Sequence, residues 1–117
     1  MSDTPLINVA ILDDMIEYIG LDALRPVIEL FMSESRSLSA TITAGANDPA
    51  QRDAVRRAAH SLKSSAGQLG GAALSEAAAE LERAAESGAP LDTGAALVAR
   101  LAEATAFALT ERLKRPG

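Results

Sequence analysis

The sequence contains no cysteine and only one histidine, and aromatic residues make up 3% of its 117 positions. Without cysteine the chain can form no disulfide framework, no thiolate zinc site and no cysteine nucleophile, a composition compatible with a reducing compartment. The N-terminus lacks the basic region and apolar run of a signal peptide, and no segment approaches the roughly 18 uninterrupted apolar residues of a membrane span. We therefore expect a cytoplasmic protein with no membrane partner.

Segments of alternating apolar and polar residues rich in Val, Ile, Thr and aromatics are also lacking, so β-strands are not expected. Apolar residues nevertheless make up 48% of the sequence, which argues against disorder throughout, and alanine occupies many of these positions. Small side chains let backbones approach closely, which suits packed helices better than a half-exposed sheet. The composition predicts an all-α protein.

Capping residues and apolar spacing divide the chain into one short and four long helices. Asn8 is a plausible N-cap for the first helix, Pro26 is expected in the first turn of the second, and Asp92 or Thr93 can cap the last. The expected helices cover residues 8–19, 22–44, 49–69, 72–87 and 93–115. Because short connectors favour antiparallel neighbours, we expect residues 1–117 to form one domain, an antiparallel up-and-down four-helix bundle with a short additional N-terminal helix.

The short N-terminal helix carries two apolar stripes, whereas one short helix rarely needs two to bury itself. The first stripe is Val9, Leu12, Ile16 and Ile19, and the second is Ile11, Met15 and Tyr18. Two interpretations are open. Either the helix is wedged deep in the bundle, or the second stripe is a patch that faces a partner.

The single histidine, His60, lies near the middle of the third expected helix and points away from the apolar stripe of that helix. The side chains at helical spacing around it are Arg56, Arg57, Lys63, Ser64 and Gly67. Residues 49–69 are net positive, although the whole chain carries a net charge of −5. An acidic protein with one basic helix is not expected to bind nucleic acid, and its partner should carry an anionic group or an acidic pocket.

Metal binding and triad chemistry do not fit the surroundings of His60. A zinc or di-iron site needs several His, Cys or carboxylate ligands, and the position three before the histidine is Arg57, so we expect no metal site. No acidic residue lies one helical turn from His60, and neither a nucleophile elbow nor a phosphate-binding loop occurs. What remains is either an incidental histidine or one that itself accepts a phosphoryl group.

Two neighbours favour the phosphoryl acceptor. Lys63 lies three residues after His60, and because helical side chains lean toward the N-terminus it should lean back over the histidine. Ser64 and Gly67 are small and leave room for another protein's active site. Tight packing against the neighbouring helix is an equally good explanation of Gly67, since glycine inside a helix costs about 1 kcal/mol relative to alanine.

Residues 59–70 resemble the signature of the histidine-containing phosphotransfer (HPt) domain family. In that signature a histidine is followed by lysine three positions later, then by small residues, and by glycine ten positions after the histidine. The matching residues are His60, Lys63, Ser64, Ser65 and Gly70. Ser64 stands where glycine is commoner and adds a hydroxyl near the expected phosphate. The resemblance extends over nearly the whole chain, including Glu29-Leu30-Phe31 and residues 74–82.

The resemblance implies a phosphorelay intermediate of two-component signalling. His60 would accept a phosphoryl group from a receiver-domain aspartate and pass it to another, and Lys63 would contact the phosphate. Secondary polar candidates are Ser64, Gln68 and Glu82. Small residues expected to allow the partner to approach are Gly67 and Gly70. Residues expected to dock the partner are Arg56, Arg57, Ile11 and Met15.

The implied partners are receiver domains of response regulators or hybrid histidine kinases, which would supply Mg²⁺, so no cofactor is expected on this chain. Such a protein is a phosphocarrier and not an enzyme, with no kinase or ATPase activity of its own. We expect a monomer, because the site must stay accessible. Two alternatives are a helical adaptor that binds receivers without carrying phosphate, and the histidine domain of a chemotaxis-type kinase.

Overall fold

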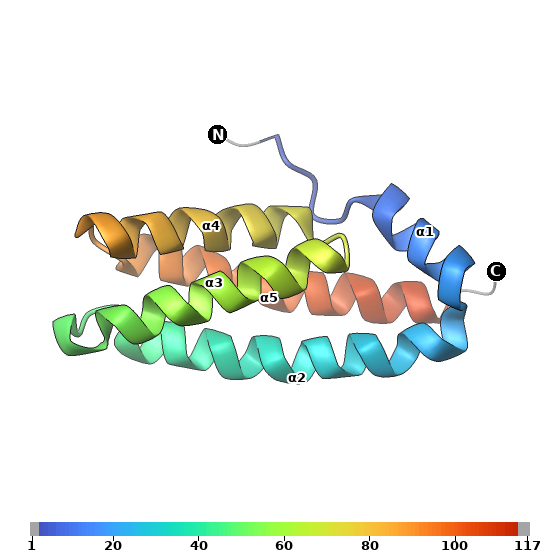
Figure 1. Cartoon of the computed structure of the whole chain (residues 1–117), viewed down its shortest axis with the longest axis horizontal. Helices are drawn as coiled ribbons and strands as arrows, with labels where there is room; N and C mark the ends of the chain where they lie inside the picture. The colour runs from blue at the N-terminus through green and yellow to red at the C-terminus, as the bar shows by residue number, and fades with distance from the viewer. Residues whose placement is uncertain (1–2, 115–117) are drawn as a thin grey trace.

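The computed structural model describes residues 3–114, and over this range the chain is helical without a strand, as the sequence predicts. The elements are α1 (Val9–Ile19), α2 (Leu21–Gly45), a 3-10 turn η1 (Pro49–Gln51), α3 (Arg52–Gln68), α4 (Ala72–Ser87) and α5 (Asp92–Leu113). The four long helices lie side by side, and the chain reverses direction at each connection between them (Figure 1). Both α2 and α4 pack against α3 and α5, so the four helices close a ring that we call the bundle.

The helix boundaries lie close to the expected ones because most of their signals are local. Asn8 caps α1 by accepting the N–H of Ile11 at 3.4 Å, and Asp48 caps η1 by accepting the N–H of Ala50 at 3.0 Å. Gly88 ends α4 in the left-handed conformation, with φ of 82°. The expected end of the last helix, residue 115, lies outside the described residues.

Three local predictions need correction. Because α2 begins at Leu21, Pro26 lies in its second turn and not in its first, where it removes one N–H from the helical ladder. The third helix begins as the separate turn η1 and becomes α-helical at Arg52. Asp92 makes no capping hydrogen bond; it lies inside the first turn of α5, where a carboxylate is favoured by the helix dipole.

The core is built from apolar side chains of α2–α5, and α1 contributes little to it. Leu12 is the buried residue of α1, whereas Val9, Ile11 and Ile19 are exposed and Tyr18 is 91% exposed. The interpretation of a helix wedged deep in the bundle is therefore wrong. Instead α1 lies at one end of the bundle, beyond the C-terminal end of α3 (Figure 1).

The interface between α3 and α4, which we call the α3–α4 seam, is the most extensive helix–helix contact in the bundle. The guanidinium of Arg52 donates to the carbonyls of Ala85 at 3.0 Å and Ala84 at 2.7 Å, and also to that of Ala89. The carbonyls of Ala84 and Ala85 belong to the last turn of α4 and that of Ala89 to the connector that follows it, so Arg52 ties α3 to the end of α4 and to the start of this connector. Further along, the hydroxyl of Ser75 donates to the carbonyl of Lys63 at 2.9 Å. These polar contacts help to fix how the two helices lie along each other.

Candidate functional site

His60 lies on the outer face of α3, and its side chain is 58% exposed. The opposite face of the helix is the apolar stripe predicted from the sequence, and that stripe is buried in the core: Val55, Ala59, Leu62, Ala66 and Leu69. The prediction that His60 points out of the bundle is therefore confirmed. Its ring is accessible to another protein without any rearrangement of the core.

Glu82 of α4 joins His60 and Lys63 into one cluster, which we call the His60 cluster. One carboxylate oxygen lies 2.8 Å from Nδ1 of His60, and the other accepts from Nζ of Lys63 at 2.8 Å. The Glu82 side chain is only 11% exposed, so the contact lies in the α3–α4 seam. The resemblance ranked Glu82 as a secondary candidate, whereas the structure places it at the centre of the site.

The charge state of Glu82 determines which nitrogen of His60 is free. The hydrogen bond from Lys63 lowers the pKa of Glu82 below its ordinary value of 4.5, against the opposing effect of burial. The group is therefore an ionised carboxylate at neutral pH, and a carboxylate only accepts hydrogen bonds. Nδ1 of the neutral imidazole must then carry the proton, which leaves the lone pair on Nε2 directed away from Glu82.

The small residues after His60 have different surroundings. Ser64 is exposed one turn further along α3. A Cβ on Gly67 would lie 3.3 Å from the hydroxyl oxygen of Ser75, so close packing against α4 accounts for this glycine. Gln68 is exposed at the end of α3, about 12 Å along the helix from His60 at 1.5 Å per residue, and is not part of the cluster.

Gly70 does not face an approaching partner, contrary to expectation. It is buried, with φ of 82°, and a Cβ there would lie 2.9 Å from the carbonyl oxygen of Asn8. Its own carbonyl accepts the N–H of Asn8 at 2.7 Å. Gly70 therefore ends the turn after α3 and attaches the start of α1 to it, which is a role in folding.

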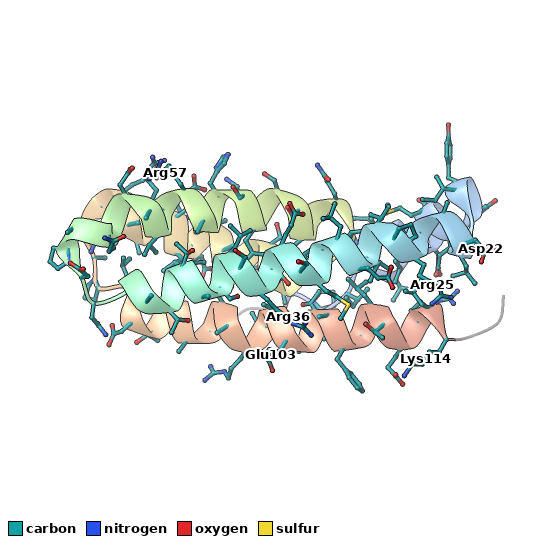
Figure 2. The ribbon with its side chains drawn as sticks, turned by 90° about the horizontal axis from the view of Figure 1, so that it is seen from below. Asp22, Arg25, Arg36, Arg57, Glu103 and Lys114 are labelled. Atoms are coloured by element: carbon teal, nitrogen blue, oxygen red, sulfur yellow. The ribbon has the colours of Figure 1, made fainter. Side chains whose placement is uncertain are left out.

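The basic surface near His60 is weaker than the sequence suggests. Arg52 is engaged with the end of α4, so its charge is not presented beside the histidine. Arg56 and Arg57 share the carboxylate of Asp53, at 2.9 and 3.3 Å. Figure 2 shows Arg57 projecting outward from α3. Both remain available to a partner, with part of their charge already balanced.

The expected docking residues of α1 lie next to the end of α3. Ile11 is exposed, and its Cβ is 3.4 Å from the position that a Cβ on Gly70 would take, whereas Met15 is half-buried against the core. Val27 and Leu30 of α2 are two further exposed apolar side chains, which the sequence analysis did not identify. The signal for Leu30 was its position two residues from Ile28, which turns it 200° away from that buried side chain at 100° per residue.

Residues 3–114 offer neither a cluster of metal ligands nor a helix that could cross a membrane. No group of three or more His, Cys, Asp or Glu side chains there is arranged to hold a metal ion. Among the helices of the same range, none is both long and apolar enough to cross a membrane.

A family model described as "Hpt domain" matches residues 26–114. The matched span includes the whole His60 cluster and begins within α2, so it leaves out α1. Comparisons with curated proteins and with solved structures give no match.

Proposed function

The chain belongs to the Hpt domain family of phosphocarriers, which act in histidine phosphotransfer within two-component phosphorelays, and from this premise we propose that His60 carries the phosphoryl group between two receiver domains. The observation that supports this role most directly is the fixed imidazole. Nδ1 is held at 2.8 Å by the Glu82 carboxylate, and Nε2 is left as an exposed nucleophile.

In the proposed transfer, the lone pair of Nε2 attacks the phosphorus of an aspartyl phosphate on the receiver. The N–P bond forms as the P–O bond to the aspartate breaks, and the aspartate leaves as a carboxylate. The ring keeps the proton on Nδ1 and becomes a phosphorylated imidazolium, whose positive charge faces Glu82. The buried aspartate of a Ser-His-Asp triad stabilises an imidazolium in the same way. The second transfer runs these steps in reverse toward another aspartate.

Lys63 is the proposed phosphate contact. Its ammonium group lies 2.8 Å from one oxygen of the Glu82 carboxylate, whose other oxygen contacts Nδ1 of His60, so Lys63 and the imidazole already share one carboxylate before the phosphoryl group arrives. The new group brings about two negative charges, and a positioned cation lowers the energy of a transition state in which charge spreads over the phosphoryl oxygens. Because transfer depends on positioning and charge, we propose that Mg²⁺ and the acidic pocket come from the receiver and that this chain holds no cofactor.

One receiver can cover both the histidine and the start of α1. His60 precedes the end of α3 by eight residues, about 12 Å at 1.5 Å per residue, and Ile11 lies just beyond that end. A standard interface of about 800 Å² per partner corresponds to a disc about 30 Å across. We propose that Ile11 and Tyr18 provide apolar docking area, with Arg56 and Arg57 on the other side of His60.

The test is phosphotransfer from a receiver domain phosphorylated with radioactive phosphate, with acid-labile label on this chain as the readout. We expect label on the wild type and on the control Arg100→Ala, which alters an exposed residue of α5 outside the proposed docking area, and none on His60→Gln. Equal labelling of wild type and His60→Gln would refute the assignment of His60. Binding without labelling would instead support the adaptor, and labelling only by a kinase domain would support the chemotaxis-type alternative.

A further inference from the structure

On the side of the bundle opposite the α3–α4 seam, α2 and α5 enclose an open apolar groove of about 570 Å³. The groove is lined by alanines of α5, among them Ala102 and Ala106, and by Met32 of α2. The small alanine side chains leave the space between the two helices open. Phe107 stands on its α5 side with 68% of its surface exposed. A hollow and a projecting aromatic ring thus occur on the same face, and the His60 cluster uses neither.

The rim of the groove carries one cation and one anion. Arg36 of α2 and Glu103 of α5 both line it, and they lie at nearly the same position along the bundle (Figure 2). Within residues 3–114 neither side chain has an ion pair or a side-chain hydrogen bond. A partner that fits this rim must offer an anion opposite Arg36 and a cation opposite Glu103 at matching height.

We propose that the partner is a second copy of this chain. A two-fold axis parallel to the helices and lying in the interface places α2 of one copy over α5 of the other. Arg36 of each copy then faces Glu103 of the second copy, so the dimer contains two Arg36–Glu103 pairs and every rim charge has one partner. Phe107 of each copy faces the groove of the other. The contact is self-complementary and closes on itself, so it yields a dimer and not an open polymer.

The size of the face indicates a weak dimer. The 22 residues of α5 extend about 33 Å, and two adjacent helices span about 20 Å, which gives a footprint of about 650 Å² per copy against about 800 Å² for a standard interface. The dimer leaves the α3–α4 seam on the outside of both copies. Accessibility of His60, which favoured a monomer in the sequence analysis, is therefore equally compatible with this dimer.

Exchange of the two rim charges tests the pairing directly. Arg36→Glu places two anions on the rim, and Glu103→Arg places two cations there. Homodimers of either variant bring like charges together, whereas a mixture of the two restores both opposite-charge contacts. Matched controls on α4 are Arg83→Glu and Glu86→Arg, which make the same charge changes at exposed positions outside the groove.

The measurement is sedimentation velocity of the full chain from about 10 µM to about 1 mM, because mass action makes a weak dimer visible only at high concentration. We expect dimers for the wild type and both controls, at least tenfold weaker association for each rim variant alone, and recovery in their equimolar mixture. Phe107→Ala should also weaken association about tenfold. A monomeric wild type at about 1 mM, or rim variants that dimerise as the wild type does, would overturn the proposal.

The same variants separate this proposal from the proposed function. Arg36→Glu and Glu103→Arg lie outside the His60 cluster, so label transfer from a phosphorylated receiver should be as in the wild type. Loss of dimerisation with normal labelling shows that the two properties are independent. A wild type that dimerises through this face without accepting phosphate would refute the phosphorelay role and leave the dimer standing.

Discussion

Replacing Glu82 by glutamine should slow phosphorylation of His60, because the two residues differ in the number of acceptor oxygens. The carboxylate accepts from Lys63 with one oxygen and from Nδ1 of His60 with the other. Glutamine keeps the shape but has one acceptor oxygen and an NH₂ group that only donates. In Glu82→Gln the two donors must therefore compete for one oxygen.

Lys63 should win that competition. A hydrogen bond from a charged group contributes about 1.5–3 kcal/mol and a neutral one about 0.5–1.5 kcal/mol, so the difference is about 1 kcal/mol with Lys63 partly exposed. The NH₂ group then faces Nδ1, which must accept, and the ring proton moves to Nε2, the atom that attacks phosphorus. A difference of about 1 kcal/mol leaves the reactive tautomer at about one-sixth of the population, so the initial rate should fall about sixfold.

Two measurements check this. Nitrogen-15 NMR of the imidazole at a pH where it is neutral should report the proton on Nδ1 in the wild type and on Nε2 in Glu82→Gln, and single-turnover labelling gives the rate. Glu80→Gln, the same change at an exposed position of α4, is the control. Glu82→Ala should be less impaired than Glu82→Gln, because water can accept from Nδ1. Wild-type tautomer and rate in Glu82→Gln would refute the reasoning.

Four further predictions follow from the structure. Lys63→Ala should shorten the lifetime of phosphohistidine or slow its transfer, and unchanged values in a label-release time course would remove Lys63 from the site. Ile11→Glu should weaken receiver binding about tenfold by titration calorimetry, since burying Ile is worth about 1.5–3 kcal/mol, whereas Ala10→Glu on the exposed side of α1 should not. Gly70→Ala should lower the unfolding free energy measured in urea by at least about 1–2 kcal/mol, because the left-handed backbone conformation is unfavourable for alanine and its Cβ would clash with the Asn8 carbonyl oxygen. A smaller loss would mean that the turn relaxes to accommodate alanine. The folded-state pKa of Glu82 lies below its ordinary 4.5, so the stability that the carboxylate contributes is present above that pH and is lost as the pH falls through the lowered value. Between pH 7 and pH 3, the unfolding free energy measured in urea should therefore decrease less for Glu82→Gln than for the wild type.

The helices and the outward position of His60 could be predicted because their signals are local. Asn8, Asp48 and Gly88 act within one turn of their own positions, and the apolar stripe of α3 repeats within a single helix. The position of α1 could not be predicted in this way. Two apolar stripes show that a helix could be covered on two sides, but they do not show that the chain itself supplies the cover, and here Tyr18 remains exposed.

The polar contacts between helices also could not be predicted from the sequence. Glu82 lies 22 residues after His60 on a different helix, and which α4 side chain meets the histidine depends on how the two helices lie along each other. Arg52 contributes to the net positive charge of residues 49–69, but periodicity does not reveal that its guanidinium reaches the end of α4. Gly70 matched the family signature, but its role in the turn after α3 depends on the Asn8 backbone, and the sequence does not show that the two lie side by side.

The clamp made by Arg52 also fixes the register of the site. Arg52 precedes His60 by eight residues, about 12 Å along α3, and its three acceptors are the carbonyls of Ala84 and Ala85 at the end of α4 and of Ala89 just after it. A slip of α4 along α3 by one turn, about 5.4 Å, would break this clamp and the His60–Glu82 contact together. Lysine could not replace Arg52, because a single ammonium lacks the planar fork of donors that grips several carbonyls. Arg52 lies outside the His60 cluster, but it sets the alignment of α4 along α3. The position of the proton on Nδ1 of His60 depends on that alignment.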